Sequence, residues 1–210
     1  HVFVVNVVSG ETRQITDGEG EDSTPAWSPD GARIAFVSDR GAEREITNRT
    51  GAYLVNALGG EIEHISSSLN SVAALTWSPD GESIAVAGSD VDGADAGWQA
   101  WLFTLERGRE PCKLTDDSIS PAGGYSPLVP APEMRWTSDG RILFLAGHQG
   151  QISMFSVSLA DDEFRQITAG GAGIGQVTYS ESAAWAIIQN LPTDSAGDLV
   201  LIDLESGSTT

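Results

Sequence analysis

Trp27-Ser28-Pro29-Asp30-Gly31 recurs along the 210-residue chain, as Trp-Ser-Pro-Asp-Gly at 77–81 and as Trp-Thr-Ser-Asp-Gly at 136–140. A degenerate fourth copy, Tyr-Ser-Glu-Ser, starts at residue 179. Recurrence at a spacing of about 50 residues indicates a repeat architecture. The repeated positions that we take as structural are Trp27, Pro29, Asp30, Gly31, Trp77, Pro79, Asp80, Gly81, Trp136, Asp139 and Gly140.

A second motif keeps the same phase as the first. In this motif a basic residue is followed, directly or after a glutamine, by isoleucine or leucine and then by threonine or serine. Its four copies are 13–16, 64–66, 113–115 and 165–168, and they end at Thr16, Ser66, Thr115 and Thr168. Two motifs recurring in one phase make the chain a repeat protein.

Each repeat is expected to contain four short β-strands. In the first full copy these are 26–27, 33–38, 52–58 and 61–66, and the second strand is apolar almost throughout, as suits a sheet covered on both faces. Ser-Pro-Asp-Gly supplies a tight turn, because proline presets φ and glycine closes the turn. No stretch has a sustained helical period. The sequence therefore predicts an all-β fold, a β-propeller of four-stranded antiparallel blades with its tryptophans between neighbouring sheets.

The propeller is expected to be incomplete, with about four blades over residues 1–210 and boundaries near 16/17, 66/67, 115/116 and 168/169. Residues 2–7 match third strands such as 199–204, so strand counting gives a half blade before the first full repeat. We interpret the chain as part of a longer polypeptide that supplies the remaining blades.

Composition restricts the partners. The net charge of −19 argues against nucleic acid and against anionic membrane surfaces. Cys112 is the only cysteine, so no internal disulfide can form, and we expect a packed, inert thiol. No secretory signal is seen, which favours a cytoplasmic location. We expect no cofactor and no metal.

The stretch Arg-Ile-Ala-Phe-Val-Ser-Asp-Arg at 33–40, directly after Trp-Ser-Pro-Asp-Gly, resembles the propeller repeats of TolB and of the prolyl oligopeptidase family. Residues 58–66 and 192–199 are similar to the acylaminoacyl-peptidase and dipeptidyl-peptidase branch of that family. The resemblance implies a serine peptidase in which the propeller restricts peptide access to a separate α/β-hydrolase domain with a Ser-Asp-His triad.

No catalytic residue is expected within this chain. The nucleophile motif of such hydrolases, Gly-x-Ser-x-Gly, is absent, and the closest stretch, Gly-Tyr-Ser at 124–126, continues with Pro127. The histidines His64 and His148 are expected to be structural. The hydrolase domain therefore lies outside residues 1–210 in this interpretation, and the whole polypeptide, not this chain, is the expected enzyme.

Three further patterns have an ordinary and a functional interpretation. Asp90, Asp92 and Asp95 resemble part of a calcium loop, but position twelve of that loop is Trp101 instead of glutamate, so we expect an exposed acidic turn. The sequon at 48–50 is expected to be a plain turn. Glu43 and Glu45 resemble the glutamates that hold substrate amino termini in dipeptidyl peptidases, although their neighbours do not match.

The long connections of the chain are expected on one face of the propeller. One of them is 116–132, and its part 125–132 is the stiffest segment because its prolines hold it extended. Variable loops on a rigid scaffold carry function. We therefore take this segment as a candidate interface with the hydrolase domain or guard of the substrate entrance, through Tyr125, Leu128, Pro130 and Pro132.

Three functions remain open. The first is a non-catalytic propeller segment of a prolyl-oligopeptidase-family peptidase, whose partners are the rest of its own polypeptide and, indirectly, peptide substrates. The second is a free-standing TolB-like propeller that binds a protein or peptide. The third is a propeller glycosidase, which the inner strands disfavour because Glu133 is their only acid.

Overall fold

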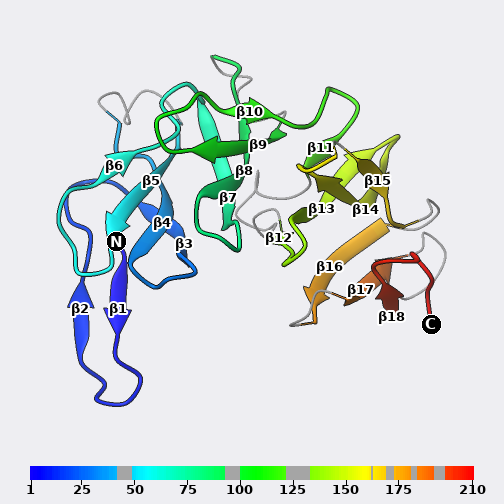
Figure 1. The fold of residues 1–210 in the computed structure, drawn as a ribbon, viewed down its shortest axis with the longest axis horizontal. Helices are drawn as coiled ribbons and strands as arrows, with labels where there is room; N and C mark the ends of the chain where they lie inside the picture. Colours follow the sequence, from blue (N-terminus) through cyan, green and yellow to red (C-terminus); the bar gives the residue numbers. More distant parts are fainter. Residues whose placement is uncertain are drawn as a thin grey trace. The chain divides into compact units, whose positions relative to one another are not determined.

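The computed structural model describes residues 1–41, 49–92, 100–121, 133–161, 163–168, 173–180, 184–191 and 197–210. Over these ranges the chain forms β-strands and no helix, and thus no helix that is long and apolar enough to cross a membrane. The strands pair into antiparallel sheets (Figure 1). The architecture is an incomplete all-β propeller, as predicted, and the chain divides into two compact units, 1–114 and 115–210.

The first unit contains three sheets. A two-stranded sheet, here called the half blade, precedes blade 1 and blade 2, each of which has four strands in sequence order. The strands are β1 (Phe3–Val5) and β2 (Thr12–Gln14) in the half blade; β3 (Asp22–Trp27), β4 (Arg33–Ser38), β5 (Gly51–Asn56) and β6 (Glu63–His64) in blade 1; and β7 (Ser71–Trp77), β8 (Ser83–Ser89), β9 (Trp101–Glu106) and β10 (Cys112–Lys113) in blade 2.

The second unit contains two sheets, blade 3 and blade 4. The last described strand of blade 4 receives one further bridge, between Ile202 and Thr209. The strands are β11 (Ser120–Pro121), β12 (Met134–Trp136), β13 (Arg141–His148), β14 (Gln151–Ser158) and β15 (Phe164–Gln166) in blade 3; and β16 (Gly173–Tyr179), β17 (Trp185–Leu191) and β18 (Asp198–Asp203) in blade 4.

The first-strand position of blade 3 is split. β11 and β12 both pair with β13, and Pro121 lies opposite Ala146. The prediction that 116–132 is all connection is therefore wrong for its β11 residues. Proline is tolerated there because β11 is an edge strand among the strands that the structure describes. The other first strands, β3, β7 and β16, each carry a register shift in the same region, so the split occurs where every first strand is irregular.

The repeated pentapeptide folds as a hydrogen-bonded turn. The Ser28 hydroxyl donates to the Asp30 carboxylate at 2.6 Å and accepts from the Arg33 backbone N–H at 2.9 Å, while Gly31 has φ of 70°. The left-handed φ is the conformation that glycine adopts without strain. Ser78 and Asp80 repeat the hydroxyl–carboxylate bond in blade 2, and Thr137 and Asp139 repeat it in blade 3. These carboxylates serve the turn, as predicted from their repetition.

The second motif also has a structural role. The hydroxyls of Thr16, Ser66 and Thr168 accept from backbone N–H groups of Val2, Ala52 and Met154 at 2.8, 2.8 and 2.9 Å. In each case the donor belongs to the third-strand region of the same sheet. The hydroxyl thus satisfies a buried backbone donor that would otherwise be costly to leave unpaired.

The apolar core lies mainly between neighbouring sheets. One cluster joins blade 1 to blade 2 through residues such as Leu54, Trp77 and Phe103, and a second joins the half blade to blade 1 through Val2 and Phe36. In the second unit a separate cluster joins blade 3 to blade 4. The second strands are buried on both faces, which explains their nearly continuous apolar sequence.

Trp77 lies between blades as the repeat predicts, but Trp27 does not. The Trp77 side chain belongs to the core, and its indole N–H donates to the Ala26 carbonyl of blade 1 at 3.1 Å. Trp27 occupies the same position in blade 1 and is 52% exposed. The half blade supplies only third- and fourth-strand positions, so the described chain gives Trp27 no first strand to pack against.

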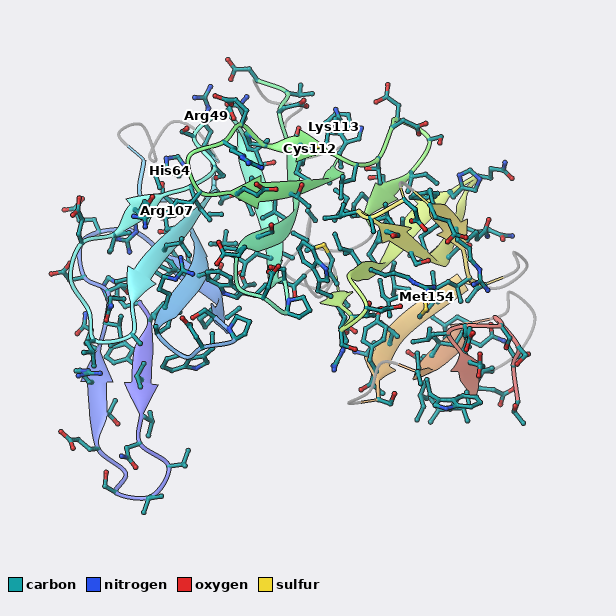
Figure 2. All side chains as sticks on the ribbon, viewed as in Figure 1. Arg49, His64, Arg107, Cys112, Lys113 and Met154 are labelled. Carbon is teal, nitrogen blue, oxygen red and sulfur yellow. The ribbon has the colours of Figure 1, made fainter. Side chains whose placement is uncertain are left out.

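The prediction of a packed Cys112 thiol is wrong as well. Cys112 lies in the two-residue edge strand β10 and is exposed, next to Lys113 (Figure 2). Among the described strands, none pairs with the outer side of β10 to cover it.

Native Cys112 is expected to react with Ellman's reagent without denaturant. Reaction of one thiol per chain, at a rate close to that of the chain unfolded in urea, should follow from its exposure. A thiol that reacts only after unfolding would contradict the position of β10.

Candidate functional site

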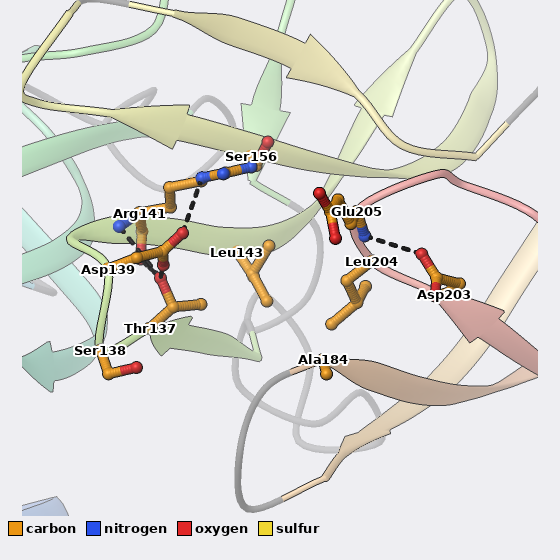
Figure 3. Close-up of a pocket in the computed structure, with 10 residues that line it drawn as sticks. All are labelled: Thr137, Ser138, Asp139, Arg141, Leu143, Ser156, Ala184, Asp203, Leu204 and Glu205. Carbon is orange, nitrogen blue, oxygen red and sulfur yellow. Dashed lines mark hydrogen bonds and ion pairs between the residues drawn. The ribbon is translucent and has the colours of Figure 1, made fainter.

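Grooves open at equivalent places between neighbouring blades in each unit. Strand register defines the equivalence: Arg33 lies opposite Asn56 in blade 1, and Arg141 lies opposite Ser158 in blade 3. The groove between blades 1 and 2, here groove 1–2, has a volume of about 640 Å³. The groove between blades 3 and 4, here groove 3–4, has a volume of about 340 Å³ (Figure 3).

Groove 1–2 is tied together by side chains that cross it. The Arg33 guanidinium lies 5.1 Å from the centre of the Trp77 ring and donates to the Gly81 carbonyl at 3.1 Å. Arg107, which follows β9, forms two contacts with the Glu63 carboxylate, at 3.0 and 2.9 Å. Leu54 packs in the core beneath them. Most of the polar groups in this groove are thus already used between the blades.

Three of the side chains that form these ties are replaced in groove 3–4. Tyr179 replaces the tryptophan, Leu204 replaces Arg107, and Arg165 replaces Glu63, as the strand registers show. Ser156 stands at the position of Leu54. Among the described residues, the Arg33–Trp77 and Arg107–Glu63 contacts thus have no counterpart at the same positions of groove 3–4, and Ser156 is a polar residue in its lining.

Groove 3–4 is lined by one cationic and three anionic side chains, which are Arg141 and Asp139 on blade 3 and Asp203 and Glu205 on blade 4. On blade 3, Nε of Arg141 contacts the Asp139 carboxylate at 3.0 Å, and its terminal amino groups make no hydrogen bond to the described residues. On blade 4, Glu205 makes no ion pair with them either, and Figure 3 shows its side chain on the side that faces blade 3. Leu143, Leu204 and Ala184 form the apolar part of the lining.

The other acid of the blade 4 wall, Asp203, is used by its own turn. Its carboxylate accepts from the backbone N–H groups of Ser206 and Glu205 at 2.7 and 3.1 Å and from the Ser206 hydroxyl. These hydrogen bonds, led by that from the Ser206 backbone, lower the pKa of Asp203. Asp203 therefore stays ionised and keeps the Glu205 backbone in place.

A serine–histidine contact occurs in blade 1 but is not catalytic. Ser66 Oγ lies 3.4 Å from His64 Nε2, while the same hydroxyl accepts from the Ala52 backbone. Ser66 is fully buried, so no substrate can reach it. His64 stacks on Tyr53 at 4.5 Å, and burial lowers its pKa. Both residues are structural.

Glu133, Arg135 and Tyr179 form a polar cluster at the first strands of blades 3 and 4. The Arg135 guanidinium lies 6.0 Å from the Tyr179 ring centre. Burial raises the pKa of Glu133. Burial, and to a lesser extent the Glu133 charge, raise the pKa of Tyr179, whose buried hydroxyl has no hydrogen-bond partner among the described residues. Glu133 is a single acid here, which does not suit the paired carboxylates of glycoside hydrolysis.

The acidic stretch after β8 pairs with cations of the protein itself. Asp92 pairs with Arg49, and Asp90 lies 3.4 Å from Lys113. Within the described ranges, no group of three or more His, Cys, Asp or Glu residues could hold a metal ion. His148 is structural, since Nδ1 lies 3.1 Å from the Ser118 carbonyl and the ring packs on Phe155.

Several predicted positions lie outside the described residues. These are the interface residues Tyr125, Leu128, Pro130 and Pro132, together with Glu43, Glu45, Asn48 and Asp95. Sequence reasoning in turn missed groove 3–4. The sequence does show that Tyr179 replaces the repeated tryptophan in the fourth repeat. Which residues line the groove beside it can be assigned only from the pairing register of the strands.

Comparison with known proteins agrees with this architecture. The family model described as TolB beta propeller domain matches residues 1–117. Dipeptidyl-peptidase 5 of Porphyromonas gingivalis is 42% identical over 45 residues, which cover 21% of this chain and 7% of that protein.

Solved structures with the same fold include both TolB and a peptidase. TolB from Acinetobacter baumannii superposes with a TM-score of 0.69 and 20% identity, covering 99% of this chain and 47% of that protein. A puromycin-hydrolyzing peptidase of Mycobacterium tuberculosis superposes with a TM-score of 0.74 and 18% identity, covering 97% of this chain and 30% of that protein. The chain thus spans less than half the length of each of these proteins.

Proposed function

The chain belongs to the TolB beta propeller domain family, and we propose that it is the non-catalytic propeller segment of a prolyl-oligopeptidase-family serine peptidase. In this proposal it restricts peptide access to an α/β-hydrolase domain outside residues 1–210. The observation that carries the choice is the 45-residue match to Dipeptidyl-peptidase 5, which is 42% identical, and the fold shared with a peptidase supports it.

The geometry of the described residues fits a supporting role. The contact between Ser66 and His64 is buried, and the Ser66 hydroxyl accepts a hydrogen bond from the backbone. The grooves are lined by arginine, carboxylate and aliphatic side chains. Such groups bind and orient a peptide but supply no activated nucleophile. Bond cleavage is therefore assigned to the hydrolase domain, with acylaminoacyl or dipeptidyl substrates as the expected class.

The decisive experiment compares the chain with the whole polypeptide that contains it. The whole polypeptide should hydrolyse chromogenic acylaminoacyl or dipeptidyl substrates and cleave short peptides much faster than folded proteins. Residues 1–210 alone should give no turnover. Turnover by the chain alone, or a reading frame without a Gly-x-Ser-x-Gly hydrolase segment, would overturn the proposal.

A TolB-like binding propeller is the second candidate. Its support is the match to TolB over 99% of this chain. A reading frame that consists of propeller repeats without a hydrolase segment, and a polypeptide inactive on both substrate classes, would favour this function instead.

A further inference from the structure

Blade 4 has an apolar face that lies outside the core of the second unit. Alternate residues of β17 and β18, such as Ala186 and Ile202, are buried in the cluster that joins blade 4 to blade 3. The residues between them point the other way and form a surface that we call the outer face of blade 4. It contains Trp185, Ile187, Leu199 and Leu201, which are between 38% and 76% exposed. Apolar residues on both faces are typical of a sheet that is covered on both sides.

The outer face of blade 4 corresponds to the face of blade 1 that packs against blade 2. Arg33 and Trp185 each begin the second strand of their blade and lie opposite the last residue of the third strand. The strand registers then make equivalent pairs of Trp185 and Arg33, Ile187 and Ala35, Leu199 and Ala52, and Leu201 and Leu54. Ala35, Ala52 and Leu54 are all buried in the core between blades 1 and 2. The same positions are therefore buried between blades in the first unit and exposed in blade 4.

The chemistry of this face fits a further blade as its neighbour. None of its four residues is charged, and Trp185 stands where blade 1 has Arg33, whose guanidinium lies over the ring of Trp77 in the next blade. A single repeat cannot bury its apolar face alone and is covered by the next repeat of the stack. The chain spans 47% of the TolB structure and 30% of the peptidase structure, so both proteins continue beyond the matched part.

We propose that the outer face of blade 4 is the docking surface for a further four-stranded blade, supplied by the polypeptide outside residues 1–210. This blade covers Ile187, Leu199 and Leu201 as blade 2 covers their equivalents in blade 1. The end of its first strand, the position that Trp77 holds in blade 2, lies against the indole of Trp185. The proposal concerns the assembly of the propeller, so it does not depend on whether the polypeptide is a peptidase or a binding propeller.

Thiol labelling of the whole polypeptide tests whether the face is covered. Leu199→Cys is combined with Cys112→Ser, and modification of position 199 by N-ethylmaleimide is followed by mass spectrometry. The native protein should react at least about a hundredfold more slowly at this position than the protein in urea, because a covered thiol reacts only when the interface opens. The exposed Cys112 of the wild type is the control and should react at a similar rate in both states. Native Leu199→Cys that reacts as fast as Cys112 would overturn the proposal.

A charge placed on the face should expose it. Ile187→Asp is expected to raise the labelling rate of Leu199→Cys in the native protein by about tenfold or more, because a carboxylate without a partner is costly to bury between blades. Val8→Asp, at a residue that is 94% exposed in the half blade, is the matched control and should leave the rate unchanged. An unchanged rate in Ile187→Asp, with the fold intact by circular dichroism, would show that the face is not an interface.

Cross-linking of the whole polypeptide identifies the segment that covers the face. Photo-leucine has nearly the shape of leucine, so its incorporation in place of leucine keeps the face intact. Cross-links from Leu199 or Leu201, located by mass spectrometry, should lead to another propeller repeat of the same polypeptide. Cross-links from these residues to an α/β-hydrolase segment, or to a second copy in a mixture of isotopically light and heavy protein, would overturn the choice of a further blade.

Discussion

Trp77→Ala is expected to lower the free energy of unfolding by about 3–5 kcal/mol, the usual cost of truncating a buried tryptophan. Trp77 fills the core between blades 1 and 2, donates to the Ala26 carbonyl and supports the Arg33 guanidinium. Its loss therefore opens a cavity and removes two contacts between the blades. Urea unfolding followed by far-UV circular dichroism, which does not depend on the removed indole, measures the effect.

Trp27→Ala is the matched control for this substitution. The residue has the same place in the repeat but is 52% exposed, so its truncation should cost less than about 1 kcal/mol. The difference between the two variants isolates the contribution of packing between blades. Equal losses of stability in both variants would show that Trp27 is covered in the folded protein and would contradict its described position.

The pair also shows how far the sequence alone can predict this fold. The repeated pentapeptide predicts the turn and its hydrogen bonds because those depend on residues within five positions of one another, such as Ser28 and Arg33. The burial of a tryptophan depends instead on the preceding sheet. Identical sequence at Trp27 and Trp77 therefore gives different environments.

The residues that line groove 3–4 could not be predicted from the sequence for a related reason. Arg141 and Glu205 are far apart in the chain, and neither belongs to a motif that indicates binding. Their juxtaposition follows only when blade 3 and blade 4 pack against each other through their shared core cluster. The degenerate repeat at Tyr179 shows where the propeller departs from its own pattern, and the structure adds which side chains line the groove there.

Asp22 and Arg40 form the second feature with a large expected effect. The Asp22 side chain is completely buried. Its carboxylate accepts hydrogen bonds from Arg40 and from the Thr16 hydroxyl, each at 2.5 Å. In the sheet, Asp22 of β3 lies opposite Ser38 of β4. Arg40 also donates to the Ser38 hydroxyl at 3.1 Å and lies over the ring of Phe36. The network joins the second motif of the half blade to the first two strands of blade 1.

Asp22→Asn is expected to destabilise the protein by about 3–5 kcal/mol at neutral pH. The substitution removes the carboxylate charge that neutralises the largely buried Arg40 guanidinium. Glu106→Gln, which removes an exposed pair with Arg109, is the control and should change stability by less than about 1 kcal/mol. Thermal unfolding of the two variants beside the wild type provides the comparison.

The effect of Asp22→Asn should depend on pH in a defined direction. Burial raises the pKa of Asp22, but the hydrogen bonds from Arg40, Thr16 and Ser38 outweigh it, so the pKa is lowered in the folded protein. A lowered pKa stabilises the folded state above the unfolded value of about 3.9, and this stabilisation is lost as the pH falls through the folded value. The gap in melting temperature between wild type and Asp22→Asn should therefore be widest near neutral pH and narrow below pH of about 4. A gap that is equally small at neutral and at acid pH would mean that Asp22 is not ionised in the native network, because a neutral carboxyl and an amide differ little in their interaction with Arg40.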